Sequence, residues 1–307
     1  MNRGGRIIRK WFAMYASHLQ KRKEFKAGDD VRDAGLTTPD DIRRYDDILY
    51  GEDTGWQLLD VYRPKEADGK KLPVIVSVHG GAWVYGDKER YQYYCMSLAQ
   101  HGFAVVNFTY RLAPEFKFPA AIEDTNLVIR WIFENAAQYG LDTEHIFCVG
   151  DSAGAHQLAL YTAICTNPEY AKKFDFKVPD GFVPTAVALN CGTYRFANDG
   201  SLDDRKMALM ADYLPYGGTD EEMEMICAVN HITEKFPPVF YMTCTGDFLV
   251  NQAPILGEKL MAKKIPHEFH FYGDAKHELG HVFHCNMKME EAMRCNKEEC
   301  DFFRKFL

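Results

Sequence analysis

The chain has 307 residues, 47% of them hydrophobic and 14% aromatic, which is enough to bury the core of one large domain. Its formal net charge of −8 argues against nucleic acid as a partner. Nine cysteines, several of them in predicted buried strands, indicate reduced thiols in a cytoplasmic protein. We predict no signal peptide, no transmembrane helix and no stable membrane insertion.

The first 26 residues form a distinct basic segment with eight Lys or Arg residues and one Glu. Apolar side chains recur in it at helical spacing, at Ile7, Ile8, Trp11, Phe12, Tyr15 and Leu19. The pattern predicts a basic amphipathic helix. Such a helix lies either on a membrane surface or against the rest of the protein.

Strands and helices alternate from residue 47 onward. A hairpin is predicted at 47–50 and 57–62, followed by strands at 74–78, 104–109, 146–149, 185–190, 239–244 and 267–272. Helical stretches separate most of these strands, and the clearest of them spans 120–138. This alternation predicts an α/β fold with a mostly parallel central sheet covered by helices on both faces.

Residues 150–154, Gly-Asp-Ser-Ala-Gly, fit the pattern G-x-S-x-G. They lie between the strand 146–149 and a helix-compatible segment, which is the context of a nucleophile elbow. Small residues are needed there because the strand and the helix approach closely. The pattern predicts Ser152 as a nucleophile and gives Asp151 beside it a structural role.

A second motif, His-Gly-Gly-Ala-Trp at 79–83, follows the strand 74–78. An α/β-hydrolase carries its oxyanion loop at this place upstream of the serine. Backbone N–H groups aimed at the developing oxyanion stabilise the transition state, by about 3–4 kcal/mol for each donor. We predict the N–H groups of Gly80, Gly81 and Ala153 as the oxyanion hole.

The chain resembles the hormone-sensitive lipase-like carboxylesterases of the α/β-hydrolase superfamily. Three motifs carry the resemblance in the family's order and spacing: His-Gly-Gly-Ala at 79–82, Tyr-Arg-Leu-Ala-Pro-Glu at 110–115 and the pentapeptide at 150–154. It covers most of the chain from about residue 48 onward. Many members have glycine in place of Ala82, and a further glycine in place of Ala155. The resemblance implies an α/β-hydrolase fold with a helical lid.

The acid of the triad should follow a late strand, since the fold orders its residues as serine, acid, histidine. Asp247 comes directly after the strand 239–244 and is the predicted acid. Its role would be to hold the imidazole in one tautomer and to stabilise the imidazolium. The rival, Asp274, lies too close in sequence to the histidine loop.

Three histidines compete for the role of base: His277, His281 and His284. His281 is favoured because Val-Phe follows it, as in the family's His-x-Phe signature, and because it lies 34 residues after Asp247. His277 is the competitor, and otherwise a solvated loop residue. The spacing His281-x-x-His284-Cys285 also resembles a metal-ligand pattern, but the chain offers no matching second pair, so we expect no metal.

Two segments fall outside the core. The resemblance implies that the basic helix is part of a lid, and we favour this over a membrane surface. The polar segment 192–235 lies where the family carries the rest of its lid, and its methionines are either a pocket wall or lid core: Met207, Met210, Met223 and Met225. The predicted domains are an N-terminal lid part, 1–46, a core, 47–191 and 236–307, and an inserted lid part, 192–235.

Residues near the oxyanion glycines are candidates for substrate contact. Trp83 and Tyr85 are predicted to line the pocket, with lid contacts as the alternative. Arg111 is either an anion clamp for a carboxylated substrate or, with Glu115, a structural brace for the loops near the site. The resemblance favours the structural role.

The predicted function is a serine carboxylesterase that works through an acyl-serine intermediate and needs no cofactor. The resemblance implies esters with short to medium acyl chains as substrates. The alternatives are an amidase, deacetylase or peptidase on the same triad, and a non-catalytic binding protein. The expected partner is a small ester, and the edge strand 267–272 is a candidate surface for a homodimer.

Overall fold

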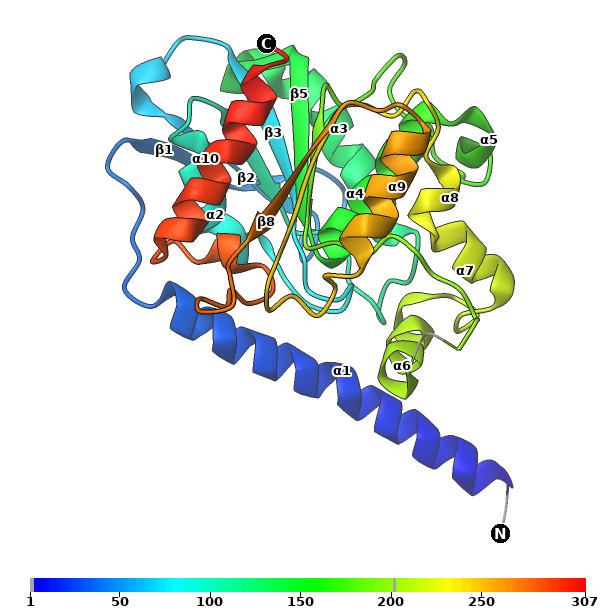
Figure 1. The fold of residues 1–307 in the computed structure, drawn as a ribbon. Helices are drawn as coiled ribbons and strands as arrows, with labels where there is room; N and C mark the ends of the chain where they lie inside the picture. Colours follow the sequence, from blue (N-terminus) through cyan, green and yellow to red (C-terminus); the bar gives the residue numbers. More distant parts are fainter. Residues whose placement is uncertain (1–2, 201–202) are drawn as a thin grey trace.

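The computed structural model describes residues 3–200 and 203–307, with side chains from His18 onward (Figure 1). One sheet of eight strands runs through it in the order β1-β2-β4-β3-β5-β6-β7-β8. β2 pairs antiparallel with β1 and β4, and the other neighbours are parallel. The strands are β1 (Ile42–Leu49), β2 (Leu58–Pro64), β3 (Leu72–Val78), β4 (Ala104–Phe108), β5 (Leu141–Asp151), β6 (Val187–Asn190), β7 (Val239–Cys244) and β8 (His267–Tyr272). The predicted α/β-hydrolase fold is confirmed.

Helices cover both faces of this sheet (Figure 1). On one face lie α2 (Lys88–Ala99) and α10 (Glu290–Arg304), and on the other α3 (Ala120–Tyr139), α4 (Ala153–Thr166) and α9 (Gln252–Ala262). Short helices complete the core: η1 (Lys65–Ala67), α5 (Pro168–Ala171) and η2 (Phe283–Cys285). The result is a three-layer architecture with a separate hydrophobic core on each side of the sheet.

The central strand β3 shows why the sequence folds in this way. Val74 and Val76 belong to the core shared with α3 and α4, whereas Ile75 between them belongs to the core shared with α2 and α10. All three side chains are buried. Because both faces are covered, the strand is a continuous apolar run rather than an alternating one.

The boundary of the predicted N-terminal lid part, 1–46, is wrong by a few residues. β1 begins at Ile42 and pairs with Pro64 of β2, so residues 42–46 belong to the sheet. The strand lies at the edge of the sheet, and only Ile42 of its eight residues is buried. Such a strand lacks the period-2 apolar pattern by which a half-buried strand is identified in sequence.

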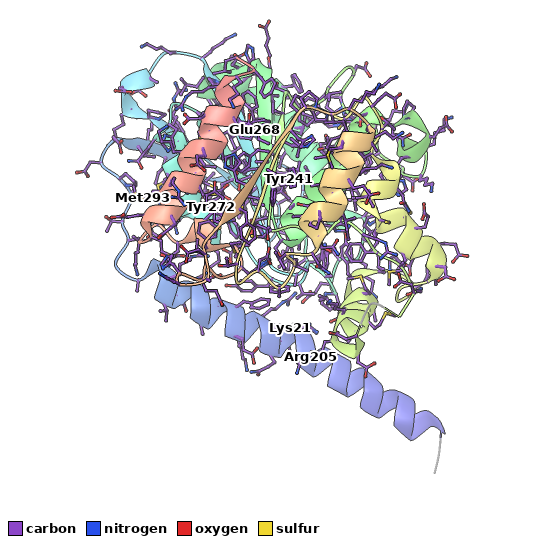
Figure 2. All side chains as sticks on the ribbon, viewed as in Figure 1. Lys21, Arg205, Tyr241, Glu268, Tyr272 and Met293 are labelled. Atoms are coloured by element: carbon purple, nitrogen blue, oxygen red, sulfur yellow. The ribbon has the colours of Figure 1, made fainter. Side chains whose placement is uncertain are left out.

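The segments predicted to form a lid lie far apart in the chain and both contain helices. The first is α1 (Arg3–Asp33), and the second holds α6 (Asp204–Tyr213), α7 (Asp220–Ile226) and α8 (Ala228–His231). α1 and α6 contact each other, near Lys21 on α1 and Arg205 on α6 (Figure 2). Since α1 ends at Asp33, it continues seven residues beyond the predicted basic segment, which ended at residue 26.

The C-terminal half of α1 is tied to the core by polar contacts. Arg22 forms an ion pair of 2.6 Å with Glu115, and its Nε donates to the carbonyl oxygen of Val84 at 2.6 Å. Further along, Asp29 accepts a hydrogen bond from Tyr85 Oη at 2.7 Å. Five of the six apolar residues of the predicted stripe, from Ile7 to Tyr15, lie outside the described side chains. Among the described residues, none of the helices has both the length and the apolar character needed to cross a membrane.

Candidate active site

The serine motif forms a tight turn between β5 and α4. Ser152 has φ 52° and ψ −117°, a positive φ that non-glycine residues rarely adopt. Its backbone N–H donates to the carbonyl oxygen of Asn190 on β6 at 2.9 Å. A Cβ atom on Gly154 would overlap the carbonyl oxygens of Val78 and His79, so only glycine allows this approach of helix and strand. The serine is held at the N-terminus of α4, above the sheet.

The structure brings the three predicted triad residues together. His281 Nε2 lies 2.9 Å from Ser152 Oγ, and His281 Nδ1 lies 2.6 Å from Asp247 Oδ1. Ser152 directly follows β5, Asp247 follows β7, and His281 follows β8, so the residues meet at the carboxyl ends of parallel strands. The exposed ring of Phe248 packs on the imidazole, with 4.2 Å between ring centroids.

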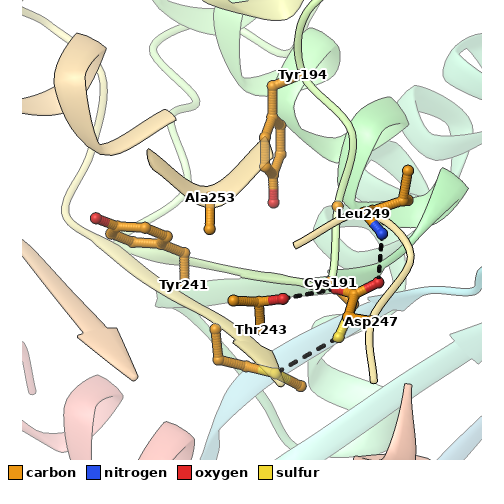
Figure 3. Close-up of a pocket in the computed structure, with 9 residues that line it drawn as sticks. Cys191, Tyr194, Tyr241, Thr243, Asp247, Leu249 and Ala253 are labelled. Atoms are coloured by element: carbon orange, nitrogen blue, oxygen red, sulfur yellow. Dashed lines mark hydrogen bonds between the residues drawn. The ribbon is translucent and has the colours of Figure 1, made fainter. Parts of the chain in front are cut away.

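The surroundings of Asp247 favour its ionised form (Figure 3). Its side chain is fully buried, and burial alone would raise the pKa. Hydrogen bonds outweigh that effect: in addition to His281, Thr243 Oγ1 donates to Oδ2 at 2.7 Å and the Leu249 N–H donates to Oδ1 at 2.8 Å. The pKa of Asp247 is therefore below its ordinary value. A carboxylate held in this way fixes the orientation of the imidazole.

The rival residues lie elsewhere. His277 is exposed and pairs with Glu291 at 2.9 Å, while Asp274 is exposed and accepts the backbone N–H groups of Lys276 and His277. His284 is fully buried in η2, where burial lowers its pKa to about 3. None of these three rivals contacts Ser152, so their positions do not favour them as alternatives.

The oxyanion loop differs from the prediction at one position. The Gly80 N–H donates to Tyr91 Oη at 2.9 Å and is therefore not available as an oxyanion donor. The N–H groups of Gly81, Ala82 and Ala153 have no hydrogen-bond partner among the described residues, and Ala82 and Ala153 line the cavity beside Ser152. Ala82 thus replaces Gly80 as a candidate donor.

The backbone conformation of the loop explains this change. Gly81, Ala82 and Trp83 all have positive φ values, of 117°, 53° and 62°. Three such residues in a row turn the chain sharply after β3, and among the described residues the N–H of Gly80 has an acceptor while the next two have none. A Cβ atom on Gly81 would overlap the carbonyl oxygen of Tyr85, which accounts for the glycine there.

Two buried carboxyl groups support the elbow from behind. Asp151 accepts a hydrogen bond of 2.7 Å from Tyr91 Oη, the same hydroxyl that accepts from Gly80, and burial raises its pKa to about 6. Glu299 on α10 accepts from Tyr94 Oη at 2.9 Å and from Asn190 Nδ2 at 2.6 Å, and burial raises its pKa to about 7. Asp151 therefore has a structural place, linking the oxyanion loop to the elbow.

A cavity of about 200 Å³ opens beside Ser152. Trp83 lines it as predicted and is fixed by a hydrogen bond from Nε1 to His156 Nδ1 at 3.1 Å. Tyr85 does not line it, contrary to the prediction, because its ring packs on Phe25 of α1. Of the four lid methionines only Met210 reaches the cavity.

The motif at 110–115 has the structural role that was favoured for it, but with other partners. Arg111 forms ion pairs with Asp124 at 2.9 Å and Glu123 at 3.0 Å, both on α3. Glu115 pairs with Arg22 on α1 and not with Arg111. Arg111 does not line the cavity beside Ser152.

In the part of the chain that the structure describes, two groups of side chains have the donor atoms that a metal would require. They are Asp151, His284 and Cys285, and Cys191, Asp247 and His281. In the first group burial raises the pKa of the Cys285 thiol well above its ordinary value, and Asp151 is engaged by Tyr91. In the second, Asp247 and His281 are engaged by each other. Neither set resembles the thiolate-rich or histidine-rich sites of structural zinc, and the absence of a metal remains a prediction.

Three contributors to the site were missed in the sequence. Ala82 was passed over because it is not glycine, although it immediately follows the two glycines. Thr243 precedes Asp247 by four residues, and Tyr91 lies on a helix distant in sequence from the serine. The position of Ala82 in the motif was a usable signal. Thr243 and Tyr91 have no such signal in the sequence, because their roles depend on how the ends of helices and strands meet in the fold.

Comparison with known proteins gives a consistent result. Residues 59–260 match the family model described as BD-FAE. The esterase LipQ of Mycobacterium tuberculosis is 31% identical over 224 residues, which cover 70% of this chain and 52% of LipQ. The carboxylesterase NlhH of the same organism is 43% identical over 198 residues, 62% of this chain and 61% of NlhH. The chain thus spans about half the length of LipQ, and a match to the esterase LipC covers 35% of that protein.

Solved structures of esterases superimpose on nearly the whole length of this chain. Esterase B from Lactobacillus rhamnosis superimposes with a TM-score of 0.86 at 25% identity, covering 96% of this chain and 95% of that one. The hyperthermophilic esterase from the archaeon Pyrobaculum calidifontis shares the fold, with a TM-score of 0.75 at 22% identity over 94% of this chain and 91% of that one. These esterases bear out the resemblance stated from the motifs. The chain belongs to the BD-FAE family and has the fold of the α/β-hydrolase esterases.

Proposed function

We propose that the protein is a serine carboxylesterase in which Ser152, His281 and Asp247 form the catalytic triad. The observation that carries this proposal is the continuous pair of hydrogen bonds from Ser152 Oγ through His281 to Asp247, at 2.9 and 2.6 Å. A hydroxyl is a weak nucleophile at neutral pH unless a base takes its proton during attack. His281 is placed to take that proton, and Asp247 to stabilise the resulting imidazolium.

The reaction then runs in two halves. Ser152 Oγ attacks the ester carbonyl while its proton passes to His281 Nε2, and the carbonyl oxygen becomes an oxyanion opposite the N–H groups of Gly81, Ala82 and Ala153. His281 protonates the departing alcohol oxygen, and an acyl-serine remains. Water repeats the attack with His281 as base, which releases the acid and restores Ser152.

The size of the cavity supports substrates with short to medium acyl chains. A volume of about 200 Å³ lies below the range of roughly 300–1,000 Å³ that is usual for drug-sized ligands. Apolar side chains, such as Met210 and Ile255, make up much of its wall. A small ester fits this space, whereas a long acyl chain would extend beyond it.

Hydrolysis of 4-nitrophenyl esters from acetate to dodecanoate tests the proposal. We expect the wild type to prefer short chains, and Ser152→Ala and His281→Ala each to lower kcat by several orders of magnitude, on the order of 10⁴ or more. His277→Ala is the matched control, since this histidine lies in the same loop but pairs with Glu291. An active His281→Ala variant, or loss of activity in the control instead, would refute the assignment of the base. A wild type inactive on every ester would shift the choice to an amide substrate or a binding protein.

A further inference from the structure

The cavity beside Ser152 has an unusual polar wall. Among the described residues, the charged side chains that line it are Arg195 and Lys206, and none is an Asp or Glu. The chain as a whole has 44 acidic and 36 basic residues, so a lining with two cations and no acid runs against the overall charge. Charge of one sign gathered in a partly enclosed cleft attracts ligands of the opposite sign.

Gln252, a neutral polar residue of the wall, also presents a donor. Gln252 Oε1 accepts the backbone N–H groups of Tyr194 and Arg195, at 2.9 and 3.1 Å. Since its oxygen is used in this way, the NH₂ end of Gln252 is the part left for a ligand. The same two bonds fix the backbone of Arg195 at the start of the inserted lid part. A group that only accepts hydrogen bonds matches such a wall.

The two cations differ in how far they are already neutralised. Arg195 forms an ion pair with Asp199 at 2.8 Å, with roughly half of each side chain exposed. Lys206 is exposed near the start of α6, and no carboxylate of the described residues lies within ion-pair distance of its ammonium group. Asp203 uses a carboxylate oxygen to accept the Lys206 backbone N–H at 2.8 Å, and it interacts with the Lys206 charge only from beyond ion-pair distance. Lys206 is thus the less neutralised of the two cations.

We propose that this cavity selects esters that carry a second, anionic group, a carboxylate, which Arg195 and Lys206 bind while the ester carbonyl lies at Ser152. The inference rests on the proposed esterase function and specifies its substrate class. The carboxylate can belong to the acid half of the ester, as in a half-ester of a dicarboxylic acid, or to the alcohol half. In both cases a carboxylate lies in the cavity, and an experiment distinguishes the two kinds of ester.

Two matched pairs of esters form the test. Monomethyl adipate and dimethyl adipate differ in a carboxylate on the acid side, and 4-acetoxybenzoate and methyl 4-acetoxybenzoate differ in one on the alcohol side. The measured quantity is the ratio of kcat/KM for the anionic to the neutral member of each pair. The rates of the same esters in buffer correct for intrinsic reactivity. The variants are Lys206→Gln, Arg195→Gln and the charge reversal Lys206→Glu, with Lys235→Gln as an exposed control in the same inserted segment.

The wild type is expected to favour the anionic member of at least one pair, and that pair identifies the half that carries the charge. Lys206→Gln and Arg195→Gln should each lower the ratio about three- to tenfold, mainly through KM, and Lys206→Glu should lower it further. Lys235→Gln should leave the ratio unchanged. Equal ratios in wild type and all variants would overturn the inference while leaving the esterase intact, because the neutral esters would still be hydrolysed. A wild type that hydrolyses neither member of either pair would refute the proposed function and this inference with it.

Discussion

The two walls of the cavity are built by different means. On the core side, Ser152 and Asp247 are held at strand ends by buried hydrogen bonds that involve the backbone. The other wall, here called the lid wall, comes from the predicted lid segment 192–235, where the side chains of Arg195 and Lys206 are exposed and Arg195 forms an ion pair with Asp199. A buried polar group that is left without a hydrogen-bond partner is costly for stability, whereas an exposed ion pair contributes at most about 1 kcal/mol to it.

We therefore expect the core wall to determine catalysis and the lid wall to determine which ester is selected. The core wall fixes the positions of the reacting atoms, so changes there should reduce turnover and stability together. The lid wall holds its charges loosely, so changes there should alter which ester is chosen while the fold persists. The following substitutions test that separation, beginning with the largest expected effect.

Asp247→Asn should lower kcat by on the order of 10⁴, because the amide can hold the imidazole of His281 in the wrong tautomer. With the amide nitrogen in the place of Oδ1, the Leu249 N–H loses its acceptor, so stability should fall as well, by about 1–3 kcal/mol. Steady-state kinetics and urea unfolding of the same variant measure the two effects. Asp274→Asn is the control, and an equal loss of turnover in that variant would contradict the assignment of the acid.

Tyr91→Phe should reduce kcat by roughly ten- to a hundredfold and stability by about 1–3 kcal/mol, because the buried Gly80 N–H loses its acceptor. Asp151 loses its donor at the same time. Tyr91 acts here as a positioning residue for the oxyanion loop, so KM should change far less than kcat. Tyr93→Phe, on the same helix with its hydroxyl on Leu36, is the control. A Tyr91→Phe variant that loses stability but keeps kcat would show a purely structural role.

Glu299→Gln should change how stability depends on pH. The folded chain binds the proton of Glu299 more tightly than the unfolded chain, because its pKa rises from 4.5 to about 7. The free energy of unfolding of the wild type should therefore fall as the pH rises through this interval, by on the order of 3 kcal/mol. This fall is the contribution of Glu299 alone, and Asp151, whose pKa is raised to about 6, adds a further fall. In Glu299→Gln the contribution of Glu299 should disappear, and the contribution of Asp151 should remain. Urea unfolding at pH 5 and pH 8 measures it, with the exposed Glu258→Gln as control. A variant slope equal to that of the wild type would refute the assignment.

Arg22→Ala should have the smallest effect, a rise in KM of about two- to fivefold with little change in kcat. Arg22 holds α1 to the carbonyl oxygens of Val84 and Ala113, which follow the oxyanion loop and the strand β4. Its ion pair with Glu115 is partly exposed and therefore weak. Lys23→Ala, exposed on the same helix, is the control. A tenfold loss of kcat in Arg22→Ala would mean that α1 takes part in the chemistry as well as in selection.

The sequence was most informative where local pattern alone determines structure. Apolar runs such as β3 and β7 predicted strands to within a few residues, and the glycines around Ser152 predicted the tight turn. Asp247 and His281 could be placed by chain order, since the carboxyl ends of parallel strands meet at one edge of the sheet. Such features depend on residues close together in sequence or on general topology.

Prediction failed where a contact depends on distant segments. Gly80 looked identical to Gly81, and only the hydroxyl of Tyr91 distinguishes their N–H groups. Tyr85 was assigned to the pocket by its nearness to the oxyanion loop, but its contact with Phe25 and Asp29 requires α1 to lie across that loop. Nothing in the local pattern around Tyr85 indicates that it contacts a residue 56 positions earlier in the chain.

The buried cysteines provide a way to measure how often the native structure opens. All nine are free thiols; eight are buried and Cys165 is half-buried. Burial raises the pKa of thiols such as Cys95 and Cys148, so the reactive thiolate is suppressed as well as shielded. A dye that labels sulfur would thus react with the eight buried thiols only when the native structure opens, and their rate of labelling would measure how often it opens. Labelling of the buried cysteines that pack against the sheet would then measure how often the sheet opens.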